Sequence, residues 1–280
     1  MRRIVDRVGL NLSRRLRRSK VELCVHEIEL RSSAGYRIAA TLFVPAGAGP
    51  IPAVVLCPGS DHHRQAFYGR GAPIRASEVA SLGCAVLIFD PSGRGESWGP
   101  EDFGGAEHQD NVVTAVRYLR STSKIAVNGI GLVGISLGVA CAVGGARRLA
   151  ESGHPVDWLI DWEGPCDQRT ITANQTMNAP AMGHKSDDTS YWSAREAVRH
   201  VGHMRAGYLR LQADPDHAQP GELEHAMDML RAANAGGLPW IRLNAHPVGV
   251  LPHEPVWLRS GPLAANRALI RALQSLIHRS

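Results

Sequence analysis

The sequence predicts an α/β protein with a mainly parallel central sheet, an N-terminal antiparallel hairpin, helices on both faces and a small insertion. Two observations predict this class. Short apolar runs alternate with helical stretches from about residue 52 to the end of the chain, and this order is typical of parallel strands joined by crossover helices. Several of the runs are apolar without interruption, as expected of strands that are covered on both faces. The length of 280 residues fits one domain with an insertion.

The strands can be placed by their apolar character and by the turns between them. Residues 21–30 and 36–44 are extended segments, and the polar stretch 32–35 between them predicts an antiparallel hairpin. Ligands bind such sheets at the carboxyl ends of the parallel strands, so functional residues are expected in the loops that follow the apolar runs. These runs predict further strands at residues 52–57, 84–89, 130–133, 156–160, 208–212 and 240–243.

Helices are expected between most of these strands. Residues 110–119 carry their valine and leucine side chains on one side of a helix. The strand pattern is lost between residues 166 and 205, and this stretch is predicted to be an insertion that forms a lid over the site. Other helical segments are predicted at residues 75–82, 139–143, 193–200, 222–235 and 263–277.

The positive charge of the chain is concentrated in residues 1–20. The formal net charge is +5, and the arginines and the lysine of this segment account for it, which leaves residues 21–280 close to neutral. The helical spacing of its apolar residues leaves two interpretations open. One is a surface anchor that makes weak contact with acidic lipid or nucleic acid, and the other, which is favoured, is a solvated amphipathic helix packed on its own domain. With 5% aromatic residues, the chain is poorly suited to stack nucleic-acid bases, and no specific nucleic-acid partner is expected.

The cysteines and the apolar runs predict a cytoplasmic protein. No apolar stretch of signal-peptide length follows the N-terminal arginines, and no run approaches the length that spans a membrane. Four of the five cysteines lie in or beside apolar runs, which favours buried thiols in a reducing compartment over a disulfide framework or a zinc site. The five are Cys24, Cys57, Cys84, Cys141 and Cys166.

A serine between two glycines is the most informative local pattern. The apolar run 130–133 leads into Gly134-Ile-Ser136-Leu-Gly138, and a helix of small residues follows at once. A serine on such a strand-to-helix turn takes a strained backbone conformation that lifts its hydroxyl clear of the sheet. Glycine is needed on both sides because a Cβ there would collide with the neighbouring strand or helix. The pattern predicts that Ser136 is a nucleophile.

Further motifs with family-like spacing accompany this turn. A carboxylate-bearing loop lies near residue 216. The other motifs are Pro58-Gly59-Ser60, Asp90-x-x-Gly93-x-Gly95-x-Ser97 and Gly134-x-Ser136-x-Gly138. With these motifs, residues 21–280 resemble the α/β-hydrolase-fold serine hydrolases, and most of all their dienelactone-hydrolase and prolyl-oligopeptidase-like esterase branches. The resemblance implies the α/β-hydrolase fold and a catalytic triad in the chain order nucleophile, acid, histidine.

The resemblance implies an acid in the loop after the strand at 208–212. The family pattern there is Gly-x-x-Asp, and Ala213 stands at the glycine position. This register makes Asp216 the match, while Asp214 falls too early in the turn. Either aspartate could instead cap the helix that follows. A carboxylate in this position would orient the catalytic histidine.

The resemblance places the catalytic base in the loop after the last strand. His246 stands close to the end of that strand, and His253 stands nearer the start of the final helix. His246 is favoured because its position depends less on the path of the loop, and His253 is the alternative base.

The remaining site residues concern the oxyanion and the substrate. The resemblance implies that the oxyanion accepts hydrogen bonds from the backbone N–H groups of Ser60 and Leu137. Asp61, Glu163 and Trp192 are candidate substrate contacts, and Glu163 is also a candidate for the acid or for a structural ion pair. Asp61 precedes two histidines, but no second ligand cluster of matching spacing accompanies them, so no metal site is expected.

These residues predict a serine hydrolase that cleaves a carboxylic ester or related acyl bond of a small-molecule substrate through an acyl-enzyme on Ser136. The chemistry needs no dissociable cofactor. Two alternatives remain open. One is an acyltransferase that delivers the same acyl group to an alcohol or an amine, and the other is a non-catalytic binding protein on the hydrolase fold.

Overall fold

The computed structural model describes residues 21–47, 49–69, 71–123, 125–173, 182–183, 187–216, 223–244, 246, 255–259 and 262–278. The basic segment 1–20, the alternative base His253 and part of the predicted insertion lie outside these ranges. Within them, no helix combines the length and the apolar character that crossing a membrane requires.

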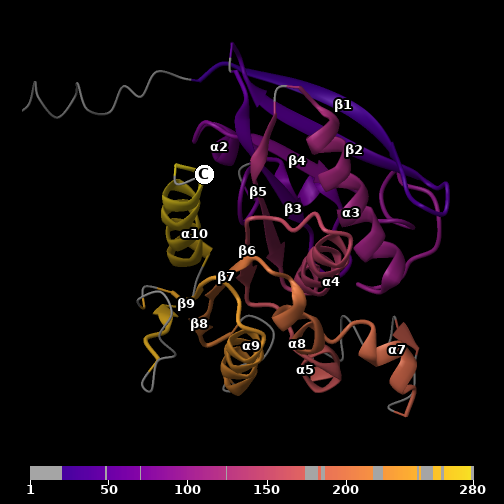
Figure 1. Ribbon diagram of the computed structural model, residues 1–280, viewed down its shortest axis with the longest axis vertical. Helices are drawn as coiled ribbons and strands as arrows, with labels where there is room; N and C mark the ends of the chain where they lie inside the picture. The colour runs from indigo at the N-terminus through magenta and orange to yellow at the C-terminus, as the bar shows by residue number, and fades with distance from the viewer. Residues whose placement is uncertain are drawn as a thin grey trace, which may run out of the picture.

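A single sheet of eight strands forms the centre of the described chain, in the order β1-β2-β4-β3-β5-β6-β7-β9 (Figure 1). The antiparallel pairs are β1 with β2 and β2 with β4, and the other neighbouring strands run parallel. The predicted hairpin and the predicted mainly parallel sheet are therefore confirmed. The strands are β1 (Leu23–Arg31), β2 (Arg37–Pro45), β3 (Ile51–Cys57), β4 (Ala85–Phe89), β5 (Ile125–Ile135), β6 (Trp158–Trp162), β7 (Gly207–Leu211) and β9 (Ile241–Leu243).

Helices cover both faces of the sheet, and the side chains of β3 show how the core is divided. Val54 and Leu56 belong to one buried cluster, whereas Ala53, Val55 and Cys57 belong to the cluster on the opposite face. Burial contributes about 1.5–3 kcal/mol for each large aliphatic side chain, so both helical layers stabilise the sheet. One layer contains α3 (Ala106–Ser121), α4 (Gly138–Glu151) and α9 (Glu224–Ala235), and the other contains α2 (Ala76–Ala80) and α10 (Pro262–Ile277).

Several elements differ from the sequence prediction. Helix α3 begins at Ala106 and not at residue 110, because the buried side chains of its first turns are polar and leave no apolar pattern. Strand β5 begins at Ile125, ahead of the apolar run, with a register irregularity in its pairing with β3. A parallel pair of two-residue strands, β8 (Ala213–Asp214) and β10 (Leu258–Arg259), is too short for any sequence period to indicate.

Short helices connect β6 to β7, where the insertion is predicted. The predicted helix at 193–200 is divided between two of them. Two contacts tie this region to the start of α3. The guanidinium of Arg195 pairs with the carboxylate of Asp102 and donates to its carbonyl oxygen at 2.8 Å, and the amide of Gln109 donates to the carbonyl oxygen of Ala194 at 2.6 Å. The helices are α5 (Gln168–Ala173), α7 (Thr189–Ser193), α8 (Ala197–His200) and the 3₁₀ helix η2 (Val201–His203).

All five cysteines are free, and four of them are buried, as the apolar runs around them predict. Burial raises the pKa of Cys84 and of Cys141 to about 12. Cys141 lies in α4, the helix that begins just after the predicted nucleophile. Because the thiol and not the thiolate is the stable form there at neutral pH, Cys141 is a core residue and no rival nucleophile.

Candidate active site

Ser136 stands on a strained turn between β5 and α4. Its φ angle is 53°, in the left-handed region that residues other than glycine rarely adopt and that costs about 1–3 kcal/mol. The N–H of Ser136 donates to the carbonyl oxygen of Trp162 at the end of β6, and the N–H of Val139 donates to the carbonyl oxygen of Ser136, each at 3.0 Å. The turn therefore has the geometry predicted from the sequence, while the nucleophilic role of Ser136 stays a prediction.

The two glycines beside Ser136 let α4 pack directly on the sheet. A Cβ on Gly134 would lie 2.7 Å from the Cα of Val139. A Cβ on Gly138 would lie 2.4 Å from the carbonyl oxygen of Cys57 and 2.5 Å from that of Pro58. These distances leave no room for a side chain, so the first turn of α4 lies against the end of β3.

The loop after β3 reaches the same turn. A Cβ built on Gly59 would be 3.4 Å from the Cβ of Ser136, and Ser60 and Leu137 are both buried. The backbone N–H of neither Ser60 nor Leu137 donates a hydrogen bond to any acceptor in the described part of the chain. Buried amides are almost always paired, so two unpaired ones beside a serine are the feature that an oxyanion hole requires. The structure brings Ser60, Ser136 and Leu137 together.

A neighbouring loop, residues 90–97 after β4, is fixed by the buried carboxylate of Asp90. This carboxylate accepts hydrogen bonds from the backbone N–H of Arg64 at 2.9 Å and of Glu96 at 2.8 Å. The hydroxyl of Ser97 donates to the carbonyl oxygen of Asp90 at 2.6 Å. A Cβ on Gly95 would lie 2.4 Å from Asp90 Oδ2. The residues of the motif Asp90-x-x-Gly-x-Gly95-x-Ser97 thus fix the conformation of this loop.

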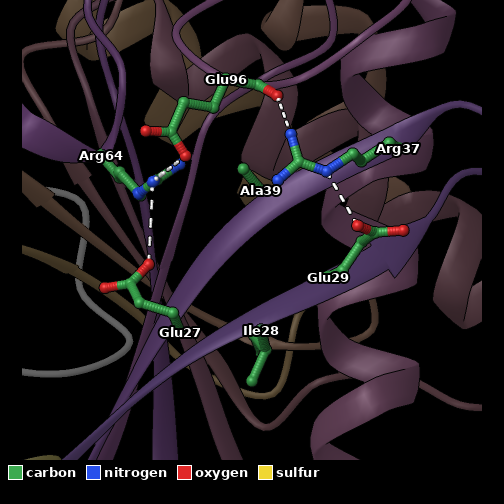
Figure 2. Close-up of a pocket in the computed structure, with 7 residues that line it drawn as sticks. All are labelled: Glu27, Ile28, Glu29, Arg37, Ala39, Arg64 and Glu96. Atoms are coloured by element: carbon green, nitrogen blue, oxygen red, sulfur yellow. Dashed lines mark hydrogen bonds and ion pairs between the residues drawn. The ribbon is translucent and has the colours of Figure 1, made fainter.

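A cavity of about 490 Å³ lies beside this loop, over strands β1 and β2. Figure 2 shows that its charged side chains are paired with one another. Arg64 lies 2.7 Å from a carboxylate oxygen of Glu96 and 3.7 Å from one of Glu27. Arg37 contacts Glu29 at 2.8 Å and donates to the carbonyl oxygen of Glu96 at 2.6 Å. These pairs hold the 90–97 loop, which follows the carboxyl end of β4, against the hairpin.

Asp216 is buried, whereas Asp214 is exposed on β8. The side-chain amide of Gln212 donates to Asp216 Oδ2 at 2.7 Å, and Nε2 of His225 lies 3.4 Å from the same oxygen. A carboxylate that orients a histidine must itself be held in place, and Gln212 supplies this support for Asp216. The geometry favours Asp216 over Asp214 as the candidate acid.

Gln212 is in turn held by a buried ion pair. Its side-chain oxygen accepts hydrogen bonds from Arg210 at 2.5 and 3.1 Å, and Arg210 pairs with Asp161 at 2.8 Å. The phenol of Tyr208 donates to Asp161 at 2.5 Å. Burial and the neighbouring carboxylate raise the pKa of Tyr208, and the charge of Asp161 raises the pKa of Arg210 although burial opposes it. The phenol therefore stays a donor and the guanidinium stays charged.

His246 lies in the loop after β9, and its role as the base stays a prediction. Its Nε2 accepts a hydrogen bond from the backbone N–H of Val256 at 2.8 Å. Neither ring nitrogen bonds to Ser136 or to Asp216 in the described residues. Asn244, at a positive φ of 48°, donates to the carbonyl oxygens of Gln212 and Val256 at 3.0 Å each, and so fixes both ends of this loop.

The three predicted substrate contacts lie in different surroundings. Asp61 is exposed on the loop after β3, with Oδ1 3.3 Å from Nδ1 of His62. Glu163 is buried at the end of β6, has a φ of 50°, and accepts a hydrogen bond from the N–H of Ala213 at 2.9 Å. Trp192 is buried in an apolar cluster that also contains Leu137, the residue that follows Ser136. Their contacts with substrate stay predictions.

Sequence reasoning singled out none of the four arginines that are buried in the described residues, and two of them, Arg210 and Arg94, lie next to the candidate site residues. Arg210 interrupts the apolar strand β7, and a charge inside such a run is a signal that a buried partner must be present. Arg94 left no such signal. It stands in a glycine-rich turn, and its guanidinium donates to the carbonyl oxygens of Gly59 at 2.7 Å and His62 at 3.2 Å.

Comparison with known proteins identifies the fold. No protein-family model and no curated protein matches the sequence. Among solved structures, the esterase Pf2001 of Pyrococcus furiosus is similar with a TM-score of 0.67 at 14% identity, over 92% of this chain and 93% of that one. An acetyl xylan esterase from Paenibacillus sp. R4 is similar with a TM-score of 0.61 at 16% identity, over 90% and 84% of the two chains.

A larger protein contains the same fold as one part. A puromycin-hydrolyzing peptidase of Mycobacterium tuberculosis is similar with a TM-score of 0.67 at 14% identity, over 93% of this chain but 40% of the peptidase. The strand order and these neighbours together show that the chain has the α/β-hydrolase fold.

Proposed function

We propose that this α/β-hydrolase-fold protein is a serine hydrolase that cleaves a carboxylic ester or related acyl bond of a small-molecule substrate. One observation carries the proposal: Ser136 is held in a left-handed conformation beside the buried amides of Ser60 and Leu137, and these amides have no acceptor in the described structure. A structural turn needs neither the strain nor the unpaired donors. The names of the fold neighbours, two esterases and a hydrolytic peptidase, fit the same class.

The reaction proceeds in two halves. Ser136 Oγ attacks the carbonyl carbon while its proton passes to a histidine, and the carbonyl oxygen becomes an oxyanion that accepts hydrogen bonds from the Ser60 and Leu137 amides. Collapse of this intermediate breaks the acyl bond, and the leaving group takes the proton from the histidine. Water then attacks the acyl-enzyme while the same histidine takes its proton. The histidine passes this proton to Ser136 Oγ as the bond to the acyl group breaks, and the carboxylic acid leaves.

The base is proposed to be a histidine of the loop between β9 and α10, oriented by Asp216. A catalytic imidazole must present an unprotonated nitrogen to the serine. The unprotonated Nε2 of His246 is occupied by the N–H of Val256. We therefore expect His253 to be the base and His246 to fix the loop, with His246 as the alternative.

Two sets of variants test the proposal on a panel of short-chain p-nitrophenyl esters and matching amides. Ser136→Ala should lower kcat/KM by at least about 10³-fold and abolish labelling by a fluorophosphonate probe, because the acyl-enzyme cannot form. Ser81→Ala, which removes an exposed hydroxyl bonded only to Ser77, should change neither. Wild-type hydrolysis by Ser136→Ala would overturn the mechanism.

The histidine assignment is tested in the same assay. His253→Gln should lose activity as Ser136→Ala does, while His246→Gln should retain it within about tenfold. If His246→Gln were inactive and His253→Gln active, His246 would be the base. Full activity in both variants would show that the base is not in this loop. Added alcohols and amines show, by product analysis, whether water is the acyl acceptor.

A further inference from the structure

Arg94 connects the loop after β4 to the loop that carries Ser60. It is buried, with 8% of its surface exposed. Its Nη1 donates to the carbonyl oxygen of Gly59 at 2.7 Å and to that of His62 at 3.2 Å. The N–H of His62 also reaches the Gly59 oxygen, at 3.4 Å. The short bond from Arg94 is thus the main constraint on the direction of the Gly59 carbonyl group.

The direction of this carbonyl fixes the direction of the Ser60 amide. The carbonyl of Gly59 and the N–H of Ser60 belong to one peptide group, which is trans. In a planar trans peptide the C=O and N–H bonds point in opposite directions. Because the Gly59 oxygen points at Arg94, the Ser60 N–H points away from it, and this N–H has no acceptor in the described part of the chain.

The guanidinium of Arg94 is itself held rigidly. Glu101 accepts two parallel hydrogen bonds from it, at 2.6 Å from Nε and 2.7 Å from Nη2, which is the strongest geometry available to arginine. The N–H of Phe103 donates to the same carboxylate at 2.8 Å. With Nε, Nη1 and Nη2 all engaged, the guanidinium plane has one orientation.

We propose that Arg94 is a positioning residue of the oxyanion hole: it holds the Gly59–Ser60 peptide so that the Ser60 N–H faces the oxyanion formed at Ser136. Its charge also polarises this peptide group, which makes the N–H a stronger donor. The inference rests on the proposed function. It assigns the glycine-rich turn after β4 a role in the reaction in place of a purely structural one.

The test measures kcat and KM for p-nitrophenyl esters in Arg94→Ala and Arg94→Lys. An oxyanion donor acts in the transition state, and losing one lowers kcat by about 10²–10³-fold. Arg94→Ala should therefore lower kcat by about 10²-fold with KM changed less than threefold. Arg94→Lys should recover little, because an ammonium cannot bind Glu101 and the Gly59 carbonyl as a planar fork does. Millimolar guanidinium should restore part of the activity of Arg94→Ala.

A matched control and a second measurement separate positioning from general damage. Arg120 also donates to two backbone carbonyls, those of His154 at 2.9 Å and Pro155 at 2.7 Å. It lies in the last turn of α3, which leads into the amino end of β5, whereas Ser136 follows the carboxyl end of that strand. Arg120→Ala should keep wild-type kinetics. A trifluoromethyl ketone, whose adduct with Ser136 carries the oxyanion, should bind Arg94→Ala weaker by the same factor as the loss in kcat/KM.

The possible failures are distinguishable. Wild-type activity in Ser136→Ala overturns the proposed function and this inference with it. An inactive Ser136→Ala combined with unchanged kcat and unchanged ketone affinity in Arg94→Ala overturns this inference alone, as does a rise in KM at constant kcat. If Arg94→Ala fails to fold, Glu101→Gln, which keeps the arginine but loosens its fork, should lower kcat in the same way, and wild-type kcat in that variant would count against the proposal.

Discussion

Arg210 is the largest side chain that the described structure buries completely, and it lies in the middle of β7. Its neighbour across the parallel pairing is Asp161 of β6. The charge is thus compensated within the sheet itself, with Tyr208 and Gln212 taking up the remaining hydrogen bonds. Because Gln212 also holds Asp216, the same group that stabilises the sheet supports the candidate acid.

Replacing Arg210 by methionine should destabilise the protein strongly. The substitution leaves the carboxylate of Asp161 buried without its partner, a change that typically costs about 3–5 kcal/mol. Arg231→Met removes an arginine that pairs with Glu224 and Asp228 at the surface, and this change should cost less than about 1 kcal/mol. Urea unfolding measures the free energy of unfolding of the two variants. Equal losses in both would show that the buried ion pair stabilises the protein no more than the surface pairs do.

Residues differ in how far the sequence can reveal them. The strained turn at Ser136 could be predicted because both glycines and the start of the helix lie within five consecutive residues. The contact of Arg94 with Gly59 spans 35 positions and exists only once β3 and β4 pair. The base could not be chosen from sequence either, because two histidines share one loop and the loop path decides which of them reaches Ser136.

At the scale of elements, the packing of α4 on the end of β3 is the contact on which the site depends. Gly138→Ala should disturb it, because the new methyl group would meet the carbonyl oxygens of Cys57 and Pro58 at 2.4 and 2.5 Å. Overpacking of this kind costs about 1–3 kcal/mol. It should also lower kcat, since the loop carrying Ser60 would move away from the turn.

Gly49→Ala is the matched control for this substitution. No atom lies within 4 Å of the position that its Cβ would take, so stability should change by less than about 0.5 kcal/mol and activity should be unchanged. Thermal unfolding and ester hydrolysis of both variants check the pair. If Gly138→Ala matched Gly49→Ala in both assays, the close packing of α4 on β3 would not be required.

Elements were predictable where one physical rule governed them. Strands covered on both faces are apolar throughout, and β3 and β4 were found for that reason. The first turns of α3 were not predicted because they bury His108, Gln109 and Asn111. These side chains belong to a polar network and follow no apolar period. The division of the predicted helix at 193–200 depends on contacts with α3 that no local pattern records.

For the molecule as a whole, buried histidines should make stability fall in mild acid. His108 accepts a hydrogen bond from the N–H of Gly104 on Nδ1 at 3.1 Å, and its Nε2 lies 2.9 Å from the carbonyl oxygen of Ser92. Both contacts suit the neutral ring, since a proton on Nδ1 would face the Gly104 N–H. Burial and the charge of Arg94 lower the pKa of His108, and burial also lowers the pKa of His200.

The sign of the pH dependence follows from these pKa values. In the unfolded chain a histidine has a pKa of about 6.5. Below that pH the unfolded state therefore binds more protons than the folded one. The contribution of these histidines to the free energy of unfolding is fully present above about pH 6.5. It is lost as the pH falls, by up to about 1.4 kcal/mol per pH unit for each such histidine. Urea unfolding at pH 7.5, 6.0 and 5.0 should show this loss.

Two histidine variants identify the source of the effect. His108→Gln should flatten the decline in stability between pH 6.5 and 5, because it removes a group that must stay neutral in the fold. His26→Gln replaces an exposed histidine of β1 and should leave the slope as it is in the parent protein. Identical slopes in all three proteins would rule out His108 as a determinant.

The ion pair between Arg195 and Asp102 has a consequence for protein engineering. If the proposed function holds, exchanging the region between β6 and β7 with that of another protein of the α/β-hydrolase fold is a route to a new substrate preference. In this chain, however, Arg195 holds Asp102, and Asp102 directly follows Glu101, the residue that grips Arg94. A chimaera should therefore keep residues 189–196 of this protein and take foreign sequence only outside them, so that a change of specificity does not reach the backbone donor beside Ser136.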